Sequence, residues 1–178
     1  MKVLIIDGSA DTSSRDTTDG YLAALKRAGC ELYVYAASRR IAPAGGWLDY
    51  SWRKAKRDNP SIPRPTTADV MYWSSVWSVE MALRLMPDWI LVMSGMFFPV
   101  QAMTMLRKAS WPQSKMALLA VDSPFDDNQI VNCLGLYDAV FTNERASVPL
   151  YRQYNPASYY LPACYDPYRH RPDLTVSD

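Results

Sequence analysis

The sequence predicts an α/β protein with a Rossmann-like, doubly wound and mostly parallel sheet of about six strands, with helices on both faces. Three observations predict it. Short apolar runs recur along the chain, stretches with helical spacing separate them, and most runs end in small or polar residues. Such runs are typical of parallel strands covered on both faces, and strands that alternate with helices form a parallel sheet. The expected strands are residues 3–6, 32–35, 89–93, 116–121, 139–142 and 159–161.

The first expected unit is a strand, a helix and a strand. The apolar run 3–6 turns polar at Asp7, residues 16–19 supply oxygens that can cap a helix, and apolar residues then recur at helical spacing. Gly29 stands where this helix would stop, and the run 32–35 follows. Two strands joined by a helix in so short a stretch are typical of a βαβ unit.

Residues 38–65 interrupt this pattern. Prolines and glycines punctuate the stretch at Pro43, Gly45, Gly46, Pro60, Pro63 and Pro65. Because the stretch is longer than an ordinary connection, we expect it to be functional, mobile or partly helical. Periodicity then resumes, and helices are expected at about 68–86, 99–109 and 128–136, with one more ending near residue 154.

The expected strands and helices form one domain over residues 1–161. The remaining residues, 162–178, are polar and rich in proline, like a linker. This tail contains His170, the only histidine, whose usual pKa suits proton transfer. Its place in the tail favours an ordinary linker residue instead.

Composition excludes several classes of protein. The net charge of +1, from 19 Lys and Arg against 18 Asp and Glu, gives the whole chain no nucleic-acid or membrane footprint. Cys30, Cys133 and Cys164 are widely spaced, which argues against a zinc site or a disulfide framework and fits a reducing cytoplasm. We therefore expect no metal site and a cytoplasmic location. We also expect no membrane span, because the longest apolar stretch, 89–100, is interrupted and shorter than the roughly 20 residues required.

The carboxyl ends of the expected strands are the candidate site, because open α/β sheets bind ligands there. The candidate substrate-binding residues at these ends are Gly8, Ser9, Ser94, Gly95, Ser123, Asn143 and Glu144. Neither the GxGxxG dinucleotide fingerprint nor the GxxxxGK(S/T) phosphate loop occurs. A nicotinamide or ATP enzyme of the standard type is therefore not predicted, and a simple tight turn is an alternative for Gly8 and Ser9.

Two carboxylates are candidates for general base catalysis. Asp122 directly follows the strand 116–121, where it can accept a proton or bind a hydroxyl. The alternative is that it caps the next turn. Asp11 is the second candidate, and a solvated side chain is the alternative because its loop is rich in Ser and Thr. Asp126 and Asp127 are expected to cap the following helix.

The segment 39–64 is basic and aromatic. It holds seven Arg and Lys residues against two Asp, with Trp47, Tyr50 and Trp52 between them. Aromatic rings stack on sugars or bases and cations attract phosphates, so Trp47, Trp52 and Arg53 are candidates for binding an anionic or nucleic-acid acceptor. The alternative is a solvated loop whose aromatic rings pack on the domain.

The C-terminal third carries a family pattern. Residues 137–151 read YDAVFTNERASVPLY, residues 160–167 read YLPACYDP and residues 170–172 read HRP. Upstream, residues 87–95 read PDWILVMSG, and residues 121–124 read VDSP with Ser in place of a second Asp. Together these motifs resemble the CgeB-type glycosyltransferases over most of the chain.

The resemblance implies a GT-B enzyme, in which two Rossmann-like domains face each other. The first domain mainly holds the acceptor and the second mainly holds the nucleotide-sugar, and this chain is expected to end about where the linker between them begins. The implied function is the acceptor-side half of a glycosyltransferase, with a nucleotide-sugar as donor substrate and no tightly bound cofactor. A nucleotide-binding second domain or partner chain would complete it. A sugar, a small molecule and a modified base in DNA are the acceptor classes left open, as is a homo-oligomer.

The main alternative is a non-catalytic Rossmann-like module that docks a partner chain or another copy. Its docking face would be the helix with Met71, Trp73, Trp77 and Met81, whose core-like spacing otherwise predicts packing. An exposed Met/Trp patch favours this module, and an open carboxyl edge beside Asp122 favours the transferase. A flavodoxin-like or receiver-like domain is a third alternative, but the acidic pair and the lysine of receivers have no counterparts here.

Overall fold

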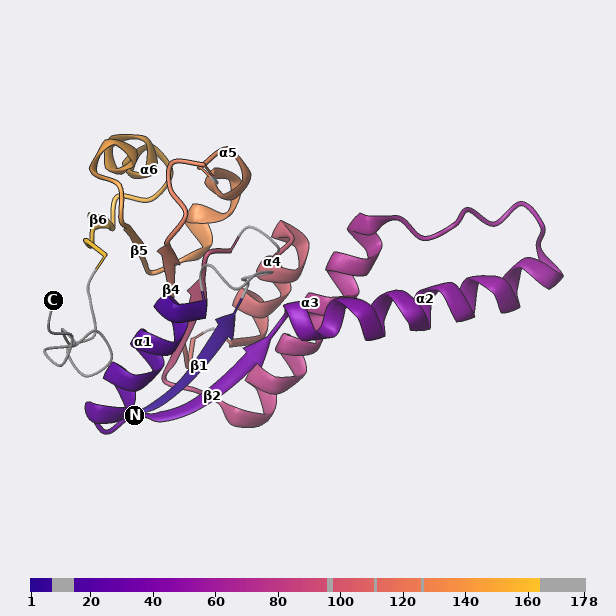
Figure 1. Cartoon of the computed structure of the whole chain (residues 1–178), viewed down its shortest axis with the longest axis horizontal. Helices are drawn as coiled ribbons and strands as arrows, with labels where there is room; N and C mark the ends of the chain where they lie inside the picture. Colours follow the sequence, from indigo (N-terminus) through magenta and orange to yellow (C-terminus); the bar gives the residue numbers. More distant parts are fainter. Residues whose placement is uncertain (8–14, 96–97, 111, 126, 164–178) are drawn as a thin grey trace, which may run out of the picture.

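A six-stranded parallel sheet lies at the centre of the protein, in the strand order β2-β1-β3-β4-β5-β6 (Figure 1). The strands are β1 (Lys2–Asp7), β2 (Glu31–Ala36), β3 (Trp89–Met93), β4 (Lys115–Ala120), β5 (Ala139–Thr142) and β6 (Ser158–Tyr160). The computed structural model describes residues 1–7, 15–95, 98–110, 112–125 and 127–163. The predicted class is confirmed, since the chain has an α/β, Rossmann-like doubly wound fold.

Helices alternate with these strands. They are α1 (Arg15–Arg27), α2 (Ser38–Asp58), α3 (Thr67–Leu85), α4 (Val100–Ser110), α5 (Asp127–Ile130) and α6 (Val148–Tyr154), with the 3-10 turns η1 (Val131–Leu136) and η2 (Arg145–Ser147). Local sequence sets the ends of α3. The Thr66 side chain accepts from the backbone N–H of Asp69 at 3.3 Å, and the Asp69 carboxylate accepts from the N–H of Thr66 at 2.7 Å. The helix ends at Leu85, and Met86, which caps it, directly precedes Pro87.

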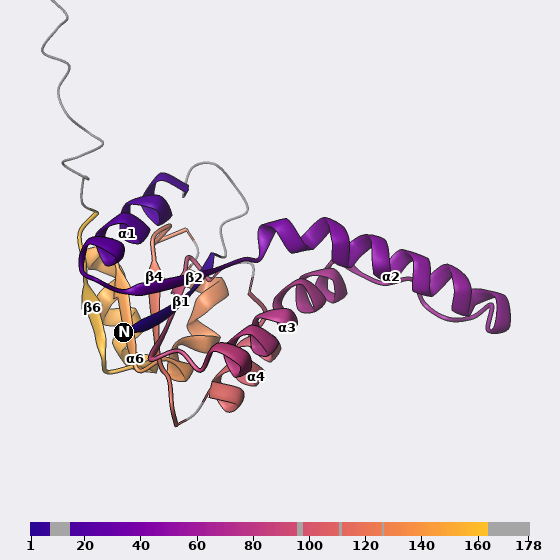
Figure 2. The same ribbon diagram turned by 90° about the horizontal axis from the view of Figure 1, so that it is seen from below.

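Helices cover both faces of the sheet (Figure 2), and a hydrophobic core lies on each face. The larger core includes Leu4 and Val92 and is covered by side chains of α3, α4, η1 and α6. The smaller core includes Ile5 and Met93 and is covered by Leu22 and its neighbours in α1. Successive side chains of a strand point to opposite faces, so the central strands contribute to both cores.

Residues 38–58, expected to be irregular or partly helical, form the single 21-residue helix α2. Pro43 removes the hydrogen bond that its N–H would have donated to the carbonyl of Arg39, its ring crowds that carbonyl, and packing against α3 compensates for both effects. Ala44 is fully buried, and a Cβ added at Gly45 would lie 3.7 Å from Val70 of α3. The helix leaves the sheet edge after β2 and projects outward as an arm (Figure 1).

The described part of the chain has no helix that is both long enough and apolar enough to cross a membrane. The tail expected at 162–178 falls almost wholly outside the described residues, because positions 164–178 are not among them. His170 lies outside them for the same reason.

Candidate functional site

The carboxyl ends of β1 and β3 form the topological switch point of the sheet. From β1 the chain continues to β2 on one side, and β3 then pairs with β1 on the other side. The helices that follow therefore leave in opposite directions, and doubly wound sheets bind ligands at such a point. Asp7 ends β1 and is paired with Met93 at the end of β3, so the turns after both strands begin at the same level.

The turn after β3 has an unusual backbone. Ser94 and Gly95 both adopt positive φ, 64° and 80°, and both are buried. The N–H of Ser94 donates to the carbonyl of Leu119 at 2.8 Å, which fixes the turn to β4. A left-handed non-glycine residue is sparsely populated and is retained only where its surroundings enforce it. This turn is therefore a shaped feature of the sheet edge.

The turn brings two predicted site residues into contact. Ser94 Oγ donates to Asp122 Oδ2 at 3.2 Å, and Asp122 follows β4 after one intervening residue, Val121. Asp122 is half-buried, and its second oxygen, Oδ1, has no hydrogen-bond partner among the described residues. A carboxylate that a serine orients in this way is suited to accept a proton from a hydroxyl group.

Phe125 is a further candidate at this edge, and it is not among the residues that the sequence predicts. Its N–H donates to the carbonyl of Asp122 at 3.0 Å, so the two residues bracket one tight turn. The Phe125 ring is 88% exposed. A phenyl ring presented to solvent in the turn that begins at Asp122 is a stacking surface for a flat or ring-shaped ligand. The signal in the sequence was an aromatic residue in a polar loop, VDSPFDD, after a buried strand.

Asn143 adds a second acceptor at the same edge. Its amide Nδ2 donates to the carbonyl of Val121 at 2.8 Å, one residue before Asp122. Its Oδ1 is buried and has no hydrogen-bond partner among the described residues. Glu144, the neighbouring candidate, has a local role instead, because its Oε1 accepts from the N–H of Ala146 at 2.9 Å and caps η2.

Ser123 is buried beneath this edge. Its Oγ lies 2.8 Å from the hydroxyl of Tyr151, which donates to Asp127 Oδ1 at 2.6 Å. Ser147 Oγ donates to Asp127 Oδ2 at 2.5 Å. The expectation that Asp127 caps the next helix is wrong for its side chain, because both carboxylate oxygens serve this buried network. The network ties the loop after β4 to α6.

The candidates on α2 form a separate cluster. Trp47 packs edge-on against Trp73 of α3, with ring centroids 5.4 Å apart. The indole N–H of Trp52 donates to the carbonyl of Ile62 at 3.2 Å. Arg53 forms an ion pair with Asp49 at 2.8 Å. These side chains lie along the projecting arm, and the structure does not join them to Ser94 and Asp122.

Three further candidates lie outside the described residues, namely Gly8, Ser9 and Asp11. Asp126 lies outside them as well.

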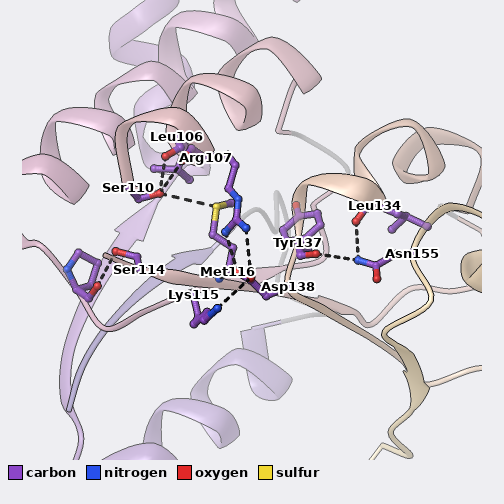
Figure 3. Close-up of polar contacts among 11 residues, drawn as sticks. Leu106, Arg107, Ser110, Ser114, Lys115, Met116, Leu134, Tyr137, Asp138 and Asn155 are labelled. Atoms are coloured by element: carbon purple, nitrogen blue, oxygen red, sulfur yellow. Dashed lines mark hydrogen bonds and ion pairs between the residues drawn. The ribbon is translucent and has the colours of Figure 1, made fainter. Parts of the chain in front are cut away.

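Another charged cluster sits at the opposite, amino end of the sheet (Figure 3). Arg107 donates to both carboxylate oxygens of Asp138, at 2.7 and 3.2 Å, and the N–H of Met116 donates to Asp138 Oδ2 at 2.8 Å. The hydrogen bonds from Arg107 hold the pKa of Asp138 below its ordinary range. Asp138 directly precedes β5, so this cluster joins α4 to the start of two strands and is structural.

Buried tyrosine and cysteine side chains lie beside that cluster. Burial raises the pKa of Tyr137 well above its usual value, and burial also raises the pKa of the Cys133 thiol to about 11. Asn155 donates to the carbonyls of Leu134 and Tyr137 at 2.8 and 2.9 Å (Figure 3). Both titratable groups therefore stay protonated near neutral pH, and neither is suited to act as a nucleophile or base.

Compared with known families and with curated protein sequences, the chain matches no family model and none of those sequences.

Proposed function

We propose that this chain is the acceptor-side domain of a GT-B-type glycosyltransferase, with Asp122 as the general base. The observation that carries the proposal is the Ser94–Asp122 contact at the carboxyl edge, beside the switch point of the sheet. The donor is a nucleotide-sugar that a second domain or partner chain mainly binds. This assignment accords with the motifs that resemble the CgeB-type enzymes.

The proposed step uses Asp122 to activate an acceptor hydroxyl. The acceptor oxygen forms a bond to the anomeric carbon of the donor sugar while its proton passes to Asp122 Oδ1. The bond from that carbon to the diphosphate breaks, and the nucleoside diphosphate leaves with the electron pair. Ser94 would orient the carboxylate through Oδ2, which leaves Oδ1 for the proton.

Two neighbours of Asp122 support an acceptor that carries hydroxyl groups. The exposed ring of Phe125 can stack on the apolar face of a sugar or a base. The Oδ1 of Asn143 is buried without a hydrogen-bond partner among the described residues, and a rotation of its side chain would let it accept from a ligand hydroxyl. A ring with several hydroxyl groups satisfies both features.

The packing of α3 bears on the alternative of an interaction module. Trp77 and Met81 pack against the larger core, and Met71 and Trp73 are half-buried. The helix is flanked by α2 and α4. The exposed Met/Trp patch that such a module would need is therefore not formed by α3, which favours the transferase.

Calorimetric titration of the chain tests the proposal. The ligands are a panel of free sugars and nucleosides as acceptors, and a panel of nucleotide-sugars as donors. We expect an acceptor to bind, and Asp122→Asn and Phe125→Ala each to weaken that binding by about tenfold or more, the loss of roughly 1.4 kcal/mol. Glu144→Gln is the matched control, because it removes a charge from the same edge and retains the cap.

Two results would overturn the assignment. One is micromolar binding of a nucleotide-sugar that Asp122→Asn leaves unchanged, since the chain would then hold the donor elsewhere. The other is acceptor binding that responds equally to Asp122→Asn and Glu144→Gln.

A further inference from the structure

The arm formed by α2 and the connection to α3 separates charge from the rest of the molecule. Residues 38–66 contain seven of the 19 basic residues and two of the 18 acidic residues, a net charge of +5. The other residues contain 12 basic and 16 acidic residues, a net charge of −4. The arm projects away from the sheet (Figures 1 and 2), and the described residues outside it hold 10 basic and 11 acidic residues, so the positive charge of the arm is presented apart from an almost neutral body.

One face of α2 carries an ordered stripe. Its members follow one another at spacings of three and four residues, all are exposed, and they are Arg40, Pro43, Trp47, Tyr50, Lys54 and Arg57. Side chains at such spacings lie on one side of a helix. The stripe has two aromatic rings at its centre, cations at both ends and no acidic residue, and it is about 25 Å long.

Both aromatic rings of the stripe are exposed, and one of them also packs against α3. Trp47 is 50% exposed, although its inner edge packs against Trp73. Tyr50 is 68% exposed. Two large rings are thus presented to solvent between cations, and they contribute little to the core. The nearby Asp49 does not neutralise the stripe, because it pairs with Arg53 and Arg64.

We propose that this stripe binds single-stranded nucleic acid, with the cations on phosphates and Trp47 and Tyr50 stacked on bases. Interleaved aromatic and basic side chains are the means by which proteins bind single strands without sequence preference. A membrane-surface helix would instead separate an apolar face from a charged face. Here the apolar face of α2, with Ala44 fully buried, is used against α3. The proposal is independent of the transferase assignment, because it concerns binding alone.

The test measures binding of a fluorescein-labelled thymidine oligonucleotide of about 20 nucleotides, by anisotropy, between roughly 50 and 200 mM salt. We expect affinity to fall with salt. The double variant Lys54→Ala/Arg57→Ala should weaken binding and reduce the slope of log K against log salt by about 1.4, or roughly 0.7 for each phosphate that no longer meets a cation. The matched control is Arg84→Ala/Lys108→Ala, which removes two exposed cations outside the arm and should leave the slope unchanged.

Tyr50 separates nucleic acid from other polyanions. Tyr50→Ala should weaken oligonucleotide binding by roughly 5- to 100-fold, and Tyr50→Phe should restore it, because stacking needs the ring and not the hydroxyl. Binding of heparin, which has no bases, should not respond to Tyr50→Ala. Circular dichroism confirms that each variant keeps α2.

Four results would overturn the proposal. The first is that the wild-type chain fails to bind the oligonucleotide at roughly 50 mM salt, and the second is that the arm and control double variants lose equal affinity. The third is oligonucleotide binding that Tyr50→Ala does not weaken, and the fourth is a dimer, seen by light scattering, that Tyr50→Ala dissociates. The third result would indicate that the arm binds anionic surfaces in general, such as vesicles that contain phosphatidylserine. The fourth would assign it to a second copy of the chain.

Discussion

The backbone at Ser94 and Gly95 shows how single residues shape the candidate site. Gly95 has a φ of 80°, and a Cβ added there would lie 3.1 Å from Leu118 Cδ1. Glycine meets both conditions without cost, whereas a side chain meets a disfavoured conformation and a close contact together. The preceding Ser94 accepts its own positive φ because the sheet edge holds it, and this directs Oγ to Asp122.

Gly95→Ala should therefore lower the free energy of unfolding by about 1–3 kcal/mol, measured by urea denaturation. Gly46→Ala is a control with the opposite sign. Gly46 lies in α2 with open space around it, and alanine there should stabilise the protein by about 0.5–1 kcal/mol. Equal effects of the two substitutions would contradict the role assigned to the turn.

The hydroxyl oxygen of Tyr151 is the central atom of the buried hydrogen-bond network beneath Asp122. Tyr151→Phe removes its hydrogen bonds to Ser123 and Asp127 and leaves a buried carboxylate with one partner fewer. We expect a loss of about 1–3 kcal/mol in the free energy of unfolding. Tyr154→Phe, at an exposed position of the same helix, should change stability by less than about 0.5 kcal/mol. A neutral Tyr151→Phe variant would show that the network is not stabilising.

Asp138 gives the fold a dependence on pH. Its pKa in the folded state is depressed, chiefly by hydrogen bonds from Arg107, below the ordinary value of 3.8. The folded state thus binds the proton more weakly than the unfolded state. The stabilisation is present in full above the ordinary pKa and is lost as the pH falls through 3.8 toward the lower folded value.

Asp138→Asn should lower stability by about 1–3 kcal/mol at neutral pH and should remove part of the acid-dependent loss. Urea denaturation at several pH values between neutral and strongly acid checks both effects. A variant with the wild-type dependence on pH would exclude Asp138 as its source.

At the scale of elements, α2 is a helix although its local sequence disfavours one. Pro43 lies inside it, and the absent N–H and the ring together disfavour the turn that contains Arg39. Packing on α3 compensates for this cost.

Pro43→Ala should therefore stabilise α2 by up to about 3 kcal/mol. Hydrogen exchange should show slower exchange of the α2 amides that follow position 43. Pro60→Ala, in the connection after α2, should leave those amides unchanged. Faster exchange after Pro43→Ala would mean that the proline itself stabilises the arm.

At the scale of the whole molecule, the sequence was most informative where the pattern is periodic and local. The six strands are short apolar runs in a polar background, and each lies where the sequence predicts it within a residue or two. Helix α2 was not predicted as one element because Pro43, Gly45 and Gly46 weaken its local signal, and its stability comes from packing against α3. Tertiary packing therefore determines that this segment is helical.

For the candidate site too, the sequence predicts the local features and not the long-range contacts. The sequence predicts that Ser94 and Asp122 lie at one edge of the sheet, because both follow buried strands and a parallel sheet brings strand ends together, and their contact confirms that placement. It did not identify the partners of Asp127, because Ser147 and Tyr151 lie 20 and 24 residues away and no local pattern links them. The sequence predicts Trp47, Trp52 and Arg53 as binding residues too, but they lie on α2, which projects from the sheet as an arm (Figure 1).

The central claim is that the edge formed by Ser94, Asp122 and Asn143 binds the acceptor. Chemical-shift mapping of the isotopically labelled chain, titrated with the panel of sugars and nucleosides, tests it most directly. Binding of an acceptor should shift the backbone amides of Ser94, Gly95 and Asp122, and Asp122→Asn should strongly reduce those shifts at the same subsaturating ligand concentration. Shifts confined to α2, or no shifts with any member of the panel, would contradict the claim.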